Sequence, residues 1–110
     1  MSPGDEIDVV KKHQVIEWLK AELVGSVGGL FKAVVAGGGD LVLDCLARII
    51  TSTYLLGRRL GLSFNRVDMK VEQNLRSNIA DKHEIEEWYG DLSALVAYFE
   101  LSRGEKDGGK

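Results

Sequence analysis

The stretch LVGSVGGLFKAVV, residues 23–35, decides the fold. Apolar residues in and before it recur at steps of three, four and seven, which is typical of one face of an α-helix. They are Ile16, Leu19, Leu23, Val27, Leu30 and Val34. The row runs through Gly25, Gly28 and Gly29, each of which costs a helix about 1 kcal/mol relative to alanine. We expect a long helix from about Asp8 to the following triple glycine, with the glycines allowing two helices to approach closely rather than opening a pocket.

A second helix is expected from about Leu41 to Leu60, with Asp40 as its N-cap and Gly61 as its end. Its apolar face is broad and consists of Val42, Leu43, Leu46, Ile49, Ile50, Tyr54 and Leu56. A helix that is apolar over more than half of its circumference is usually central or lies at a subunit interface. We therefore expect a homodimer or a larger homo-oligomer.

Two further helices are expected downstream. The first begins after Ser63 and ends near Asn78. The second begins with Asp81 and Glu84, whose separation of three residues is typical of a capping box. No segment alternates like a strand, so the predicted fold is all-α, a bundle of four helices with short connections.

Length and composition indicate one domain, since the chain has 110 residues with 45% hydrophobic and 28% charged side chains. We expect the domain to cover residues 1–101 and the polar residues 102–110 to form a disordered tail. The net charge of −3 gives no sign of nucleic-acid binding. The single cysteine, Cys45, favours a reducing compartment. With no secretion signal and no apolar run that could cross a bilayer, we expect a cytoplasmic protein without a membrane partner.

Two short runs resemble the MazG family of all-α nucleoside triphosphate pyrophosphohydrolases. Residues 25–34 are similar to the family's Glu-Glu-Val-Gly-Glu-Leu-x-Lys-Ala run, and residues 44–49 to its Asp-Glu-Leu-Ala-Asp-Val run. Residues 55–62 also look like the leucine-rich stretch that follows in the family. In the family, two pairs of carboxylates from these runs converge on magnesium, which prefers hard oxygen ligands and bridges to substrate phosphates.

The four positions that the resemblance assigns to the metal carry no acid in this chain. They are Ser26, Gly29, Cys45 and Arg48. A Glu-x-x-Asp spacing occurs nowhere in the sequence. The chain therefore resembles a short, divergent MazG-like protein with a degenerate active site. For such a protein we expect no catalytic residue, no metal and no other cofactor.

Three function classes remain open. The leading hypothesis is a non-catalytic structural or regulatory protein with residual nucleotide or phosphate affinity at Arg48, Arg58 and Arg59. For Arg48 alone, a simple ion pair with Asp44 one turn away is the preferred interpretation. The second hypothesis is a magnesium-dependent nucleoside triphosphate pyrophosphohydrolase whose metal ligands lie outside the four positions named above. Those candidate ligands are Asp40, Asp44, Glu84, Glu87 and Asp91. The third is a helical module that binds another protein through its last helix.

Overall fold

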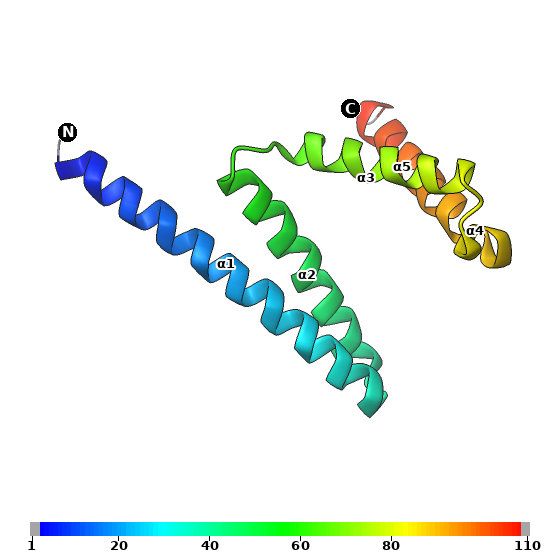
Figure 1. Ribbon diagram of the computed structural model, residues 1–110, viewed down its shortest axis with the longest axis horizontal. Helices are drawn as coiled ribbons and strands as arrows, with labels where there is room; N and C mark the ends of the chain where they lie inside the picture. The colour runs from blue at the N-terminus through cyan, green and yellow to red at the C-terminus, as the bar shows by residue number, and fades with distance from the viewer. Residues whose placement is uncertain (1–2, 109–110) are drawn as a thin grey trace. The chain divides into compact units, whose positions relative to one another are not determined.

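A computed structural model describes the backbone of residues 3–108 and the side chains of residues 8–104, and it divides the chain into two compact units. The first unit, which ends at Phe64, contains α1 (Pro3–Ala36) and α2 (Gly39–Arg59). The second contains α3 (Phe64–Ala80) from its second residue onward, α4 (Glu84–Tyr89) and α5 (Asp91–Gly108) (Figure 1). Every regular element in this described range is a helix, which confirms the all-α prediction, although there are five helices instead of four. The single domain over residues 1–101 stays a prediction.

Helices α1 and α2 form an αα-hairpin with a two-residue connection. Gly37 has a φ of 78°, a left-handed conformation that strongly favours glycine. The Gly37 amide donates to the carbonyl of Val34, and the Gly38 amide donates to the carbonyl of Ala33. These two bonds form a Schellman motif, which satisfies the last carbonyls of α1 and reverses the chain within two residues.

The predicted start of α2 is wrong by two residues. The N-cap is Gly38, whose carbonyl accepts from the Val42 amide at 2.9 Å, and Asp40 instead lies in the first turn. The reason is the short connection, because α2 begins as soon as the Schellman motif ends. In the first turn, the Asp40 carboxylate still faces the positive end of the helix dipole. The predicted end at Gly61 is confirmed, since Gly61 has a φ of 91° and directly follows the C-cap Leu60.

The contact between α1 and α2 is made by small side chains. Two small side chains are buried on each helix, seven residues apart. They are Ser26 and Ala33 on α1, and Cys45 and Ser52 on α2. Helix α1 continues through its three glycines without interruption. At Gly29, an added Cβ would lie 3.4 Å from the Cys45 sulfur, so α2 does pass close to this glycine. At Gly25 and Gly28 the prediction is wrong, because both face open space.

The second unit corrects two predicted boundaries. Helix α3 runs two residues past Asn78, and the left-handed residue that follows it is Lys82, with a φ of 58°. The predicted last helix is divided at Gly90, which has a φ of 69° and caps α4. The cap at the start of α4 is His83, not Asp81, and the Nδ1 atom of His83 accepts from the Ile85 amide.

Helix α5 continues to Gly108, so the structure places residues 102–108 in a helix where we expected a disordered tail. Residues 109–110 lie outside the described residues. Within the described part of the chain, no helix is both long enough and apolar enough to span a bilayer.

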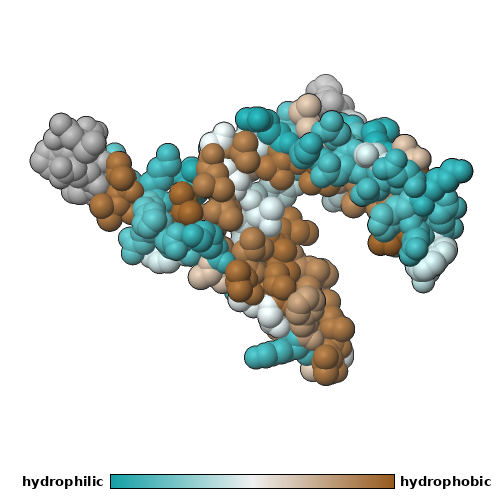
Figure 2. Space-filling view, in the orientation of Figure 1, coloured by the Kyte–Doolittle hydropathy of each residue, from teal (hydrophilic) through white to brown (hydrophobic). Residues whose placement is uncertain are grey.

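The hydrophobic core is sparse. Among the side chains described, the buried apolar ones are Ala33, Cys45, Leu75 and Val96, and none of the large side chains is completely buried. Large apolar side chains instead lie exposed, many of them on α1 and α2. Figure 2 shows this as brown surface that gathers over α2 and the adjoining part of α1.

Candidate functional site

The hairpin brings together all four positions that the resemblance assigns to a metal. Ser26 and Gly29 lie one turn apart on α1, and Cys45 and Arg48 lie one turn apart on α2. Ser26 is 7% exposed and Cys45 is 6% exposed. Because a Cβ added at Gly29 would lie 3.4 Å from the Cys45 sulfur, three of the four positions lie where the two helices pack. Small side chains therefore fill the space where the family pattern would place carboxylates.

Arg48, the fourth position, links the two helices. Its Nε donates to Oδ2 of Asp44 at 2.8 Å, which confirms the expected pair within α2. Its Nη1 donates to Oε2 of Glu22 on α1 at 3.4 Å. The Ser26 hydroxyl donates to the same Glu22 oxygen at 3.5 Å. The hydrogen bond from Arg48 to Asp44, followed by the charges of Asp44 and Glu22, raises the pKa of the Arg48 guanidinium.

Glu22 did not emerge from the sequence as a functional residue. The available signal was its position, since Glu22 lies one helical turn before Ser26 and therefore shares a face with it. Its partner Arg48 is 26 residues away, and no helical spacing predicts a contact across two helices.

For each of the two ligands expected of a pyrophosphohydrolase, the charges around Arg48 include one sign that repels it. The guanidinium repels a divalent cation, and the carboxylates of Glu22 and Asp44 repel a phosphate. These three side chains are each about half exposed, so water weakens both effects. Over the range whose side chains are described, no three His, Cys, Asp or Glu side chains gather to form a metal site.

The three candidate phosphate-binding arginines do not converge. Arg58 lies ten residues after Arg48 on the same helix, which corresponds to about 15 Å along the axis. Arg58 and Arg59 occupy the last turn of α2, where the negative end of the helix dipole favours cations and disfavours anions. The Arg58 guanidinium lies 5.1 Å from the ring centroid of Phe64, in a cation–π arrangement.

The five candidate acidic ligands are divided between the two units. Asp40 and Asp44 lie on α2 in the first unit, whereas Glu84, Glu87 and Asp91 lie on α4 and α5 in the second. The three acids of the second unit lie in the first turns of α4 and α5, where acidic side chains complement the helix dipole.

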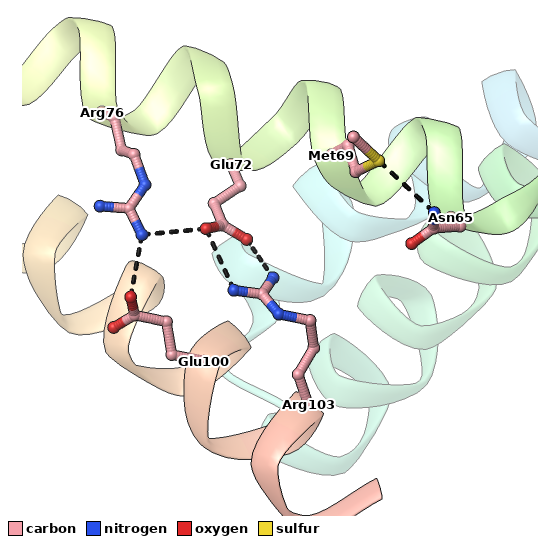
Figure 3. Close-up of polar contacts among 6 residues, drawn as sticks. All are labelled: Asn65, Met69, Glu72, Arg76, Glu100 and Arg103. Atoms are coloured by element: carbon pink, nitrogen blue, oxygen red, sulfur yellow. Dashed lines mark hydrogen bonds and ion pairs between the residues drawn. The ribbon is translucent and has the colours of Figure 1, made fainter. Parts of the chain in front are cut away.

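A second polar cluster, in the other unit, joins α3 to α5 (Figure 3). Glu72 on α3 accepts hydrogen bonds from Arg76 and from Arg103 of α5, and Arg76 also donates to Glu100 at 2.9 Å. The hydrogen bonds from Arg103 and Arg76 lower the pKa of Glu72 to about 2. The cluster lines an open groove of about 850 Å³. Sequence reasoning missed this cluster, because the contacts cross between helices and Arg103 falls in the expected tail.

Comparison with known proteins identifies one family. A family model described as the MazG-like family matches residues 9–92, which is more than half of the 110 residues. The match contains both runs that carry the sequence resemblance and all four packed or ion-paired positions. No curated protein and no solved structure matches the chain.

Proposed function

Because the chain belongs to the MazG-like family, we propose that it keeps the family's helical frame in a non-catalytic, structural or regulatory role. The observation that carries this proposal is the bridge from Arg48 to Glu22. A guanidinium stands where the family pattern has a metal-binding acid, and it joins α1 to α2.

The chemistry of the bridge supports a structural role. A magnesium ion between two helices holds them together by attracting carboxylates from both sides. Arg48 supplies a positive charge that contacts a carboxylate of each helix, through Asp44 on α2 and Glu22 on α1. Ser26 and Cys45 occupy the adjoining space as buried side chains. The hairpin therefore needs no metal to neutralise acids at this position.

Residual phosphate binding is the weaker part of the proposal. A guanidinium has five N–H donors, and the two carboxylates engage the Nε and Nη1 groups of Arg48. The remaining donors are available to a phosphate, but the paired carboxylates leave this site with a net negative charge. Phosphate affinity at Arg48 is therefore low in this proposal, and the structural role does not depend on it.

A reducing, cytoplasmic compartment and a homo-oligomeric state belong to the same proposal. Cys45 is a free thiol that packs against α1, and a buried thiol of this kind behaves as a small apolar side chain. The many exposed apolar side chains of α1 and α2 support an assembly of several chains.

Isothermal titration of the purified protein with a non-hydrolysable nucleoside triphosphate tests the proposal, with magnesium and without it. We expect no measurable binding in either titration, because Arg48 already pairs with the two carboxylates beside it and these carboxylates repel the triphosphate. Binding that requires magnesium would instead support the pyrophosphohydrolase hypothesis.

Binding without magnesium would support an arginine-based phosphate site, and Arg48→Ala would then abolish it. Lys12→Ala is the matched control, since it removes one positive charge from an exposed position of α1 away from the bridge. Equal losses in the two variants would mean that overall charge, and not Arg48, holds the phosphate.

A further inference from the structure

Helix α4 is short but capped at both ends. At its start, Nδ1 of His83 accepts from the Ile85 amide at 3.2 Å. At its end, Gly90 has a left-handed backbone and donates its amide to the carbonyl of Glu86 at 3.0 Å. The two caps hold α4 in one conformation, so its side chains leave the helix in defined directions.

Contacts with α5 decide which face of α4 is exposed. The Glu86 carboxylate accepts from the Ser93 amide at 3.0 Å and also from the Ser93 hydroxyl, so Glu86 faces α5. Successive residues of an α-helix are rotated by about 100°. Glu84 and Trp88, each two residues from Glu86, are therefore rotated about 160° away from it. They lie on the face of α4 that points away from α5.

This exposed face combines an aromatic ring with two carboxylates. Trp88 is 69% exposed. Glu84 has Glu87 three residues after it and Trp88 four residues after it, so both are its neighbours on the helix surface. Over the residues whose side chains are described, neither glutamate forms an ion pair. We call Glu84, Glu87 and Trp88 the outer face of α4.

Negative charge is concentrated around the outer face. Residues 81–91 contain five acids and one lysine, whereas the whole chain has a net charge of only −3. The described side chains nevertheless include no group of three that could hold a metal ion. A cation carried by a larger molecule therefore fits this surface better than a bare metal ion does.

We propose that the outer face of α4 binds a basic segment of a different protein, with one arginine of that segment stacked on Trp88 and paired with Glu84. A guanidinium is attracted to the face of an indole ring and forms charge-assisted hydrogen bonds with a carboxylate. Lysine supplies the charge but not the planar group that stacks. Tryptophan and arginine are also enriched among the residues that dominate the affinity of protein interfaces.

The surroundings of Trp88 favour such a contact. Ile85 and Tyr89 lie on the other side of the indole from Glu87, and they are 42% and 74% exposed. Apolar surface beside the ring excludes water when a partner covers it, which strengthens the attraction between the guanidinium and the carboxylate. A tryptophan has only two side-chain torsions, so little conformational entropy is lost when the ring is covered.

This inference deepens the structural or regulatory role proposed above by giving it a partner, and the two are tested separately. Nucleotide titration examines the Arg48 site in the first unit, whereas peptide binding examines α4 in the second. Nucleotide binding would overturn the non-catalytic role without affecting the outer face, and a failure of peptide binding would leave the Arg48 bridge unaffected.

Fluorescence anisotropy of a labelled peptide, titrated with the full chain, tests the proposal. The probe is a short peptide of alternating serine and arginine, and the matched peptides carry lysine or glutamate in place of arginine. We expect the arginine peptide to bind most tightly, the lysine peptide more weakly and the glutamate peptide not at all. Binding should weaken in about 0.5 M salt, which screens exposed charges.

Two pairs of variants locate the binding site. Trp88→Ala should raise the dissociation constant of the arginine peptide about 10-fold, because the stacking is lost. Trp18→Ala is its matched control, since Trp18 is 63% exposed on α1, and it should leave the constant unchanged. Glu84→Gln should raise the constant about threefold, whereas Asp8→Asn, which removes an exposed carboxylate from α1, should not.

Several results would overturn the proposal. They are an arginine peptide that does not bind at low salt, a lysine peptide that binds as tightly, and equal dissociation constants for Trp88→Ala and Trp18→Ala. A lower molecular mass for Trp88→Ala than for the unaltered chain would also overturn it, because a second copy would then cover the ring. Circular dichroism checks the fold, and if Trp88→Ala loses helix, the comparison of Glu84→Gln with Asp8→Asn decides.

Discussion

At the level of single residues, helical spacing predicts the polar contacts within one helix but not those between two helices. The pairs Arg48–Asp44 and Arg76–Glu72 both span four residues on one helix. The pairs Arg48–Glu22 and Arg103–Glu72 join different helices and span 26 and 31 residues. The first two pairs follow from the spacing, while the others depend on how the helices come together.

Glu72 is the residue whose protonation should affect stability most clearly. Its side chain is only 14% exposed, and its pKa is lowered from 4.5 to about 2 by Arg103 and Arg76. The folded state therefore binds this proton less readily than the unfolded state does. The stabilisation from Glu72 should be complete above about pH 5 and should disappear as the pH falls from 4.5 to about 2.

Urea unfolding at several pH values measures this effect. Between pH 5 and pH 2, the unaltered chain should lose more stability than Glu72→Gln, which has no carboxyl group to protonate at this position. Glu87→Gln, which removes an exposed carboxyl from α4, is the control and should follow the unaltered chain. Identical pH profiles for the unaltered chain and Glu72→Gln would show that the cluster does not stabilise the fold.

At the scale of the helices, glycine has opposite effects at two positions of the same hairpin. Gly37 has a left-handed backbone and ends α1, whereas Gly25 lies inside α1 with open space where a Cβ would be. The first position requires the conformational freedom of glycine. At the second, that freedom only increases the entropy lost on folding.

Replacing each of these glycines by alanine should therefore have opposite results. Gly37→Ala should lower the free energy of unfolding by about 1–2 kcal/mol, since alanine is strained in the left-handed region. Gly25→Ala should raise it by about 0.5–1 kcal/mol. Chemical denaturation of the two variants measures both changes. Equal effects of the same sign would contradict the assignment of the turn to Gly37.

For the whole molecule, the absence of the family's acidic pairs should make stability independent of magnesium. A ligand that binds only the folded state raises its stability as the ligand concentration rises above the dissociation constant. We expect the same thermal unfolding midpoint in millimolar magnesium and in excess chelator. If magnesium raised the unfolding midpoint and still did so in a Glu22→Gln variant, the ion would be bound by acids outside the hairpin. If the Glu22→Gln variant abolished the increase in the midpoint, the ion would be bound at the hairpin itself.

The sequence by itself determined the helical character of the chain, the turns at the triple glycine and at Gly61, and the four positions that the resemblance assigns to a metal. These depend on local spacing, backbone freedom and side-chain type, all of which are visible along the chain. Local patterns misplaced the caps at Asp40 and Asp81, because neighbouring turns began each helix at a different residue. They also did not predict the break at Gly90.

Only the tertiary structure decided which side chains meet across helices. It placed Glu22 beside Arg48, brought Gly29 against Cys45 and joined Glu72 to Arg103. It also divided the apolar residues of α2 into a face that packs on α1 and a flank that stays exposed. The physical reason is that hydrophobic spacing predicts which face of a helix is buried, but not which other helix it packs against. That depends on how the two helices lie relative to each other.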